Sequence, residues 1–208
     1  AKWYVQPAHI EDKGFYLPGP QKGGGDAMPL YPTGRAIKTQ SLHPQVGATD
    51  FEEGFKEIKS TELESRQGTG LFSFVWYKLD LVIPEVIGKL NTTGTTAVFE
   101  MVVDDYSEIW VNGKQMVGFG QTGNGLISGY NTRNRVILTN DAKAGEKFVI
   151  YVLGINGPVG KLPDNYIWVR NAVVDFYQSG LPVNTSWKDI GKIFTIDALQ
   201  HQLKRWRL

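Results

Sequence analysis

Planar polar side chains are concentrated in one short stretch of the sequence. Residues 130–135 read Tyr-Asn-Thr-Arg-Asn-Arg, so Asn131, Arg133, Asn134 and Arg135 offer amide and guanidinium groups close together. Proteins bind a pyranose with an aromatic ring against its C–H face and with planar donors and acceptors at its hydroxyls. An arginine fork can bond two neighbouring hydroxyls, or a uronic carboxylate, at once. The stretch predicts saccharide contacts; the alternative is a solvated turn with Asn in the left-handed conformation.

Two further amides and one indole complete the predicted saccharide site. Asn156 precedes Gly-Pro, and Asn165 precedes an aromatic strand. Loops at one end of a β-sandwich cluster together, so we expect both asparagines to join residues 130–135. Trp168 shares a strand face with Arg170 under strict alternation, and we expect it to supply the aromatic surface. Trp76 and Trp110 lie in the middle of strands, where a core position is expected.

The acidic residues of the same region predict no catalytic pair. Asp104 and Asp105 are adjacent, and Glu108 follows on the next strand. Glycoside hydrolysis needs two carboxyl groups about 5–10 Å apart, one of them with a raised pKa. Adjacent residues of a strand point to opposite faces, so we interpret the cluster as a turn that caps the strand. Catalysis and ligation of a sugar or a structural Ca²⁺ ion are the alternatives; we expect no other cofactor.

Composition excludes several other kinds of function. The 208 residues include 22 Lys+Arg and 21 Asp+Glu, and this net charge of +1 leaves no basic excess for a nucleic-acid backbone. No apolar run approaches the roughly 18–20 residues that cross a bilayer. Cysteine is absent, which excludes thiolate chemistry and Cys-based zinc sites. The three histidines (His9, His43, His201) lack metal-site spacing. We therefore expect neither nucleic acid nor a membrane as partner.

The chain is expected to be all-β. It has 24 Gly, 10 Pro, 10 Phe, 9 Tyr and 6 Trp, which is typical of short strands separated by turns. Asn112-Gly113 is a strong hairpin signal because both residues tolerate positive φ. Strands are predicted at 71–84, 97–103, 108–111, 114–117, 135–138, 147–153 and 166–177. This spacing, without a convincing helix between strands, predicts an antiparallel β-sandwich of jelly-roll type.

The predicted sandwich occupies residues 46–178. Residues 1–45 are rich in Pro and Gly but carry several aromatics, so we expect an extended, irregular lead-in packed on the domain. Residues 179–208 are expected to be a tail or linker, with a helix capped at Ser186 or Thr195 as an alternative. A start at Ala1 fits either a mature terminus trimmed of a signal peptide or an arbitrary boundary. Secretion or a periplasmic location is the expectation.

Several motifs carry a family resemblance, over roughly residues 70–178. One set resembles the sugar-binding jelly roll of family 2 glycoside hydrolases, within the galactose-binding-domain-like group: Trp76-Tyr77-Lys78, residues 104–114 with Trp-Val-Asn-Gly, and residues 144–152. A second set resembles the domain that precedes the propeller in some bacterial gluconolactonase-like proteins: residues 129–136, 154–158, 165–170 and 175–177. Lys78 departs from the glycosidase pattern, which usually has Arg.

The resemblance implies a binding role. Within these 208 residues we expect no second domain that could carry the paired carboxylates of a glycosidase or the calcium-bearing propeller of a lactonase. We therefore expect a non-catalytic carbohydrate-binding domain, accessory to a larger carbohydrate-active or lactonase-type protein with a following catalytic domain. One alternative is a structural or protein-interaction jelly roll without a sugar site. Another is a lactonase or glycosidase in its own right.

Overall fold

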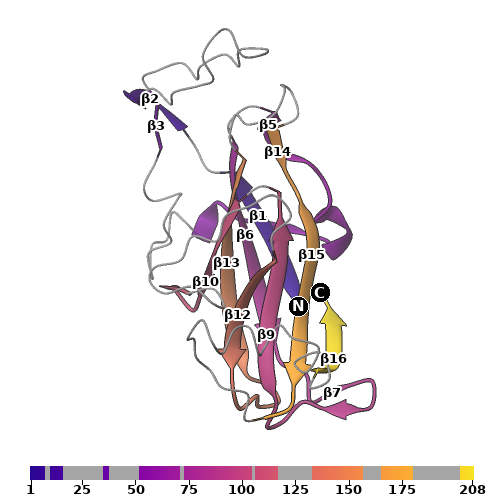
Figure 1. Ribbon diagram of the computed structural model, residues 1–208. Helices are drawn as coiled ribbons and strands as arrows, with labels where there is room; N and C mark the ends of the chain where they lie inside the picture. Colours follow the sequence, from indigo (N-terminus) through magenta and orange to yellow (C-terminus); the bar gives the residue numbers. More distant parts are fainter. Residues whose placement is uncertain are drawn as a thin grey trace, which may run out of the picture.

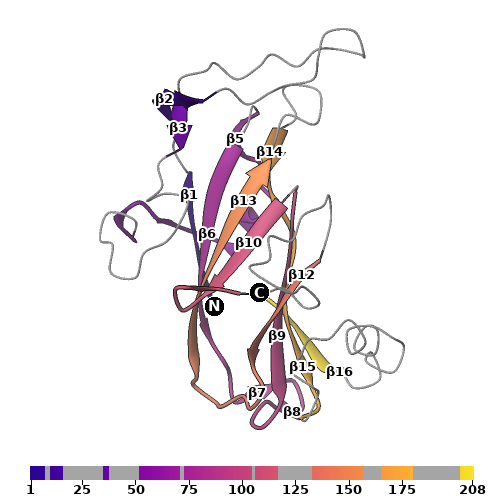
Figure 2. The same ribbon diagram turned by 60° about the vertical axis from the view of Figure 1, so that its left-hand side comes forward.

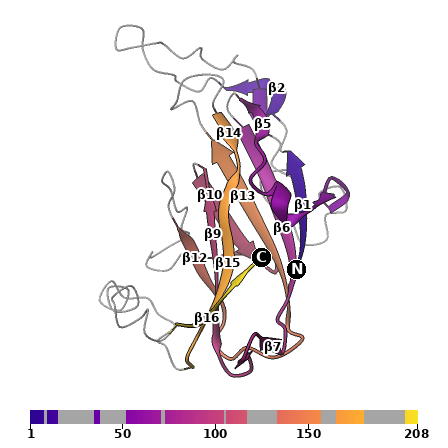
Figure 3. The ribbon, with the colours of Figure 1, turned by 90° about the vertical axis from the view of Figure 1, so that its right-hand side faces the viewer.

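The computed structural model describes residues 1–7, 10–15, 35–37, 52–70, 73–104, 106–116, 133–156, 165–179 and 202–208. Their regular structure is almost entirely β-strand, with a short 3-10 helix, η1 (Ser60–Glu62), and two helical residues at 52–53. The strands form two main antiparallel sheets that pack face to face (Figures 1 and 3). The predicted all-β antiparallel sandwich is confirmed, while its jelly-roll connectivity stays a prediction.

The larger sheet has the strand order β11-β10-β13-β6-β1-β4 and is seen most clearly in Figure 2. Its strands are β11 (Lys114–Gln115), β10 (Tyr106–Val111), β13 (Lys147–Asn156), β6 (Ser73–Val82), β1 (Lys2–Pro7) and β4 (Lys56–Ile58). The smaller sheet has the order β12-β9-β15-β16. Its strands are β12 (Asn134–Thr139), β9 (Thr96–Val103), β15 (Val169–Tyr177) and β16 (Gln202–Arg207).

Three two-stranded sheets lie outside these layers. They are β5 (Gln67–Gly70) with β14 (Asn165–Ile167), β2 (Ile10–Phe15) with β3 (Arg35–Ile37), and β7 (Val86–Ile87) with β8 (Leu90–Asn91). The β5–β14 pair lies at the upper end of the sandwich in Figure 1, and β7 lies at the lower end. These two ends serve as reference points below.

The core lies between the two main sheets and follows a period of two. Along β9, Ala97, Phe99, Met101 and Val103 belong to the core cluster, and the residues between them point to the opposite, outer face. The same alternation holds along the facing strand β6, where Val75, Tyr77, Leu79 and Leu81 point inward. Alternation therefore gives the residue faces along β6 and β9, whereas register shifts interrupt it between Val169 and Asn171 and between Ile137 and Thr139.

One glycine permits the close approach of the sheets at the upper end. A Cβ at Gly154 would lie 2.9 Å from the Ile167 side chain and 3.2 Å from the Val103 side chain.

The Asn112-Gly113 hairpin is confirmed, with φ of 50° and 75° and Trp110 opposite Gln115. Of the predicted return strand 114–117, the structure shows Lys114–Gln115, and residue 117 lies outside the described residues.

Two strands lie where the sequence predicted irregular chain or a helix. Lys2–Pro7 is a strand between β6 and β4, with Trp3 and Val5 buried in the core. The alternating pattern of these residues is short, and the many prolines that follow obscured it. Gln202–Arg207 is a strand paired with β15. The predicted strand 166–177 is divided at Trp168 into β14 and β15.

Candidate functional site

Three acidic side chains are buried on the outer face of the smaller sheet. Along β9 the residues between the core positions are Val98, Glu100 and Val102, and Asp104 continues this alternation just after the strand. Asp175 occupies an outward position on the neighbouring strand β15. All three carboxylates are buried, in spite of the cost of removing an ionised group from water. A buried charge must therefore find a partner.

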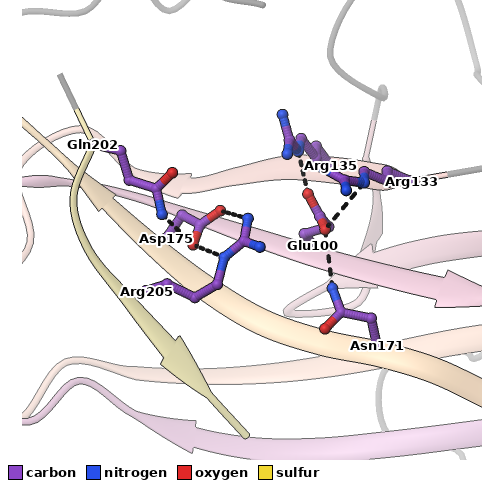
Figure 4. A network of polar contacts seen from close by, with 7 residues as sticks. All are labelled: Glu100, Arg133, Arg135, Asn171, Asp175, Gln202 and Arg205. Carbon is purple, nitrogen blue, oxygen red and sulfur yellow. Dashed lines mark hydrogen bonds and ion pairs between the residues drawn. The ribbon is translucent and has the colours of Figure 1, made fainter. Parts of the chain in front are cut away.

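Each buried carboxylate is paired with an arginine. Glu100 accepts a hydrogen bond from Nε of Arg135 on β12. Asp104 accepts one from Arg170, at 2.9 Å. Asp175 accepts two parallel bonds from Arg205 on β16, both at 2.8 Å, which is the bidentate geometry of a strong arginine–carboxylate pair. Figure 4 shows the pairs of Glu100 and Asp175 side by side on this face.

Further donors complete the coordination of two of these carboxylates. The Asn171 amide donates to Oε1 of Glu100 at 3.0 Å, and Arg133 Nε lies 3.9 Å from the same oxygen. The Gln202 amide donates to Oδ1 of Asp175 at 3.0 Å. Both oxygens of Glu100 and of Asp175 are thus occupied by donors of the protein itself (Figure 4).

The arginines lie nearer to solvent than the carboxylates they bind. The side chains of Glu100, Asp104 and Asp175 are 0%, 4% and 1% exposed. Those of Arg135, Arg170, Arg205 and Arg133 are 10%, 36%, 36% and 62% exposed. We call the surface formed by these four arginines the arginine face. The four arginines carry one more charge than the three carboxylates, so this face has a surplus positive charge.

The pairing also changes the protonation of neighbouring groups. The hydrogen bonds from Arg205 to Asp175 raise the pKa of the guanidinium, so this arginine is firmly charged. Tyr177 lies on the same strand, and its burial, together with the negative charge of Asp175, raises the pKa of its hydroxyl. Arg205 and Tyr177 therefore both stay protonated in the physiological pH range.

An aromatic residue marks the upper end of the arginine face. The Arg170 guanidinium lies 4.9 Å from the centre of the half-buried Trp168 ring, and that of Arg66 lies 5.5 Å from it. Arg66 is also 5.5 Å from the Tyr166 ring. The backbone N–H of Asp104 donates to the carbonyl of Trp168 at 3.2 Å, which ties the end of β9 to the junction of β14 and β15.

The register places Arg133 at the same end. Asn134, the first residue of β12, is opposite Met101. Arg133 precedes it and therefore lies beside Val102, whose partner on the other side is Asn171. We refer to Trp168, Arg170, Asp104 and Arg133 as the Trp168 end. Arg133 and Trp168, two residues that the sequence predicted for the site, thus both lie beside the end of β9.

The other predicted site residues have different surroundings. The Asn134 amide is buried and donates to the carbonyl and hydroxyl oxygens of Ser107, and the Asn156 amide donates to the Tyr166 carbonyl at 2.7 Å. Arg135 is buried against Glu100. Asn165 belongs to β14, opposite Gly70, at the upper end of the sandwich. Asn131 lies outside the described residues.

Sequence reasoning missed the buried carboxylates Glu100 and Asp175. A signal was present, because each is a lone charge inside an apolar strand: Val-Phe-Glu-Met-Val and Val-Val-Asp-Phe-Tyr.

The acidic residues that the sequence grouped together, Asp104 and Glu108, lie on different sheets. Asp104 lies on the smaller sheet, whereas Glu108 lies on the larger sheet and accepts a bond from the Trp110 indole at 3.3 Å. Asp105 is not among the described residues.

The expected tryptophan positions are only partly found. Trp76 is fully buried, whereas Trp110 is half-buried on an outward position of β10.

Within the described ranges, no group of three or more His, Cys, Asp or Glu residues could hold a metal ion. The three histidines all fall outside those ranges. In the same part of the chain, no helix is long and apolar enough to span a membrane.

No family of known proteins matches the sequence, and no characterised protein matches it. Solved structures with some similarity include a putative β-galactosidase from Bacteroides fragilis, at 14% identity and a TM-score of 0.40 over 84% of this chain and 23% of that one. A β-glucosidase from Kluyveromyces marxianus is 9% identical, with a TM-score of 0.37 over 91% of this chain and 17% of that one. The PA14 domain of the antifreeze protein MpAFP is 10% identical, with a TM-score of 0.29 over 50% of this chain and 43% of that one.

This chain therefore spans less than half the length of each of these structures. With identities of 14% and below and TM-scores of 0.40 and below, the similarities assign neither a family nor a ligand to it.

Proposed function

We propose that the chain is a non-catalytic saccharide-binding domain whose ligand lies on the arginine face at the Trp168 end. The observation that carries the proposal is the half-buried Trp168 ring beside the Arg170 guanidinium, which is itself anchored on buried Asp104 at 2.9 Å. An aromatic ring next to an oriented guanidinium offers the two contacts that sugar recognition needs, apolar stacking and planar hydrogen bonding.

The groups are also held rigidly enough for binding. Arg170 is fixed by its ion pair, and Asp104 is fixed by the backbone bond to Trp168. Preorganised groups lose little conformational entropy when a ligand binds. Arg66 is exposed, and its cation–π contact with the ring is of a kind that is weak at exposed sites.

The state of the carboxylates supports a role without catalysis. A glycosidase needs one carboxyl group to deliver a proton and a second to act as nucleophile or base. Both oxygens of Glu100 and of Asp175 accept bonds from protein donors, and Asp104 is paired with Arg170. The resemblance in the sequence supports the further proposal that the domain is an accessory part of a larger carbohydrate-active, secreted or periplasmic protein.

The proposal is tested by calorimetric titration with a panel of neutral and acidic oligosaccharides. We expect Trp168→Ala and Arg133→Ala each to weaken binding by roughly 1–3 kcal/mol, the size of a lost stacking face or charge-assisted bond. The melting temperature of Arg133→Ala should change little, because its side chain is mostly exposed.

Lys143→Ala is the matched control, since Lys143 is an exposed cation in the turn between β12 and β13, at the opposite end of the sandwich. Its affinity should equal that of the native chain. Unchanged affinity in both site variants would contradict the proposed location. No binding across the whole panel would instead favour a structural or protein-interaction domain. Hydrolysis of a glycoside or lactone that is lost in Asp104→Asn would show the chain to be an enzyme.

A further inference from the structure

The arginines of the arginine face differ in whether they donate a hydrogen bond to a buried carboxylate. Arg135, Arg170 and Arg205 each donate hydrogen bonds to a buried carboxylate. Among the described residues, the ion-pair partner of Arg133 is Glu100, and the 3.9 Å between Nε and Oε1 is too long for a hydrogen bond. Both oxygens of Glu100 already accept bonds, from Arg135 and Asn171. Of these four arginines, Arg133 is therefore the one whose charge no hydrogen-bonded carboxylate balances. Arg207, exposed on the same face of β16 opposite Val173, is a further cation there.

The charge of Arg133 faces solvent. The Arg133 side chain is 62% exposed, more than those of the other three arginines. A guanidinium presents several N–H donors in a planar fork, which matches the two oxygens of a carboxylate. Because Glu100 leaves that fork unsatisfied, Arg133 can bind an external carboxylate without losing an internal one.

From these observations we infer that the saccharide is acidic, and that Arg133 binds the carboxylate of a uronic acid residue while an adjacent part of the ligand contacts Trp168. This inference rests on the proposed function, since it names the ligand class of the same site.

The positions of the two groups fit one ligand. Arg133 lies beside Val102, and Val102 is paired with Asn171, the neighbour of Arg170. Arg133 and Arg170 are therefore two strand spacings apart, about 10 Å between backbones. The side chain between them, Val102, is buried at 7% exposure, so it lies beneath the surface. A short oligosaccharide that contacts both the Trp168 ring and the Arg133 guanidinium would therefore bind through these side chains above Val102.

The test compares acidic oligosaccharides with their neutral methyl esters. Oligogalacturonates and oligoglucuronates are titrated calorimetrically against the native chain, each beside its methyl ester, which has the same rings but no charge. We expect at least one acid to bind about tenfold or more tightly than its ester, the size of one hydrogen bond to a charged group. Added salt should weaken binding of the acid and leave that of the ester unchanged.

Variants of Arg133 identify the source of this preference. Arg133→Ala should bind acid and ester equally, because the surplus charge is lost. Arg133→Lys keeps the charge without the planar fork, so it should retain only part of the preference. Lys143→Ala should keep the full preference of the native chain.

The possible failures are distinguishable. If ester and acid bind equally and Trp168→Ala weakens both, the proposed function stands and the acidic ligand is wrong. If the acid is preferred but Arg133→Ala preserves that preference, the role of Arg133 is wrong. If no oligosaccharide binds, neutral or acidic, both proposals are overturned.

Discussion

Tyr77 is a polar residue in an otherwise apolar part of the core. Its side chain on β6 is fully buried, and its hydroxyl has no hydrogen-bond partner among the described residues. A buried hydroxyl without a partner costs free energy, because it gives up its bonds to water. We expect Tyr77→Phe to raise the free energy of unfolding by about 1 kcal/mol near neutral pH. Urea denaturation measures this change, and a loss of stability would contradict the account of the hydroxyl.

Tyr77 also makes stability depend on pH. Burial raises the pKa of Tyr77 above its ordinary value of 10.0, so the hydroxyl stays protonated in the folded chain. The unfolded chain loses this proton as the pH rises through 10.0, and stability falls because the folded state binds more protons. The decline above that pH should be shallower in Tyr77→Phe. Tyr151 and Tyr177 also have raised pKa values, so part of the decline should remain.

At the scale of elements, β16 is held to β15 by a charge pair as well as by its backbone. Arg205 and Gln202 of β16 both bind Asp175 of β15. Removing one partner of a buried pair leaves an uncompensated charge, which costs about 3–5 kcal/mol when both groups are fully buried. Arg205 is 36% exposed, so Arg205→Met should destabilise the chain by a smaller amount, about 2–3 kcal/mol.

Two comparisons isolate this effect. Lys204→Met changes the neighbouring exposed cation, which does not bind Asp175, and should alter stability by less than about 0.5 kcal/mol. The double variant Asp175→Leu/Arg205→Met removes both charges and should be more stable than Arg205→Met alone. Equal stability of the two Arg205 variants would show that the buried charge of Asp175 contributes nothing.

Local signals made most elements predictable. The Asn112-Gly113 turn and the apolar strand of β9 follow directly from backbone sterics and side-chain periodicity. β1 was missed because only Lys2–Pro7 alternates before the prolines, and its place in the sheet depends on β6, some seventy residues later. β16 was missed because its pairing with β15 is also non-local, although the separation is shorter.

The site was less predictable than the fold, because its contacts join residues far apart in the sequence. Arg133 and Trp168 could be named from residue type alone. The partners of the buried carboxylates lie far away in the sequence, with separations of 35 residues for Glu100 and Arg135 and 66 for Asp104 and Arg170. Only the strand order β12-β9-β15-β16 brings them together. Such an order depends on the packing of the whole chain and has no local sequence signature.

At the scale of the whole molecule, the two outer faces of the sandwich differ. On the larger sheet, the Lys78 ammonium lies 2.6 Å from Glu52 and 5.4–5.9 Å from the rings of Tyr4, Phe55 and Tyr151. The segment that carries Glu52 and Phe55 thus covers the middle of that face with the protein's own side chains. On the smaller sheet the outward residues Val98, Val102 and Val173 are also buried, and guanidinium groups reach solvent above them. The proposed binding surface is this layer of guanidinium groups.

The most direct test of this account is a two-dimensional ¹H–¹⁵N NMR titration that follows the indole N–H of each tryptophan and the Nε–H of each arginine. The probe is the oligosaccharide of the panel that binds most tightly. Trp168→Phe and Arg133→Lys identify the two key signals. Saccharide binding at the Trp168 end predicts that the signals of Trp168, Arg133 and Arg170 shift with one common dissociation constant, while that of Trp110 stays in place. Shifts confined to Trp110 and the larger sheet, or no shifts at all, would contradict the account.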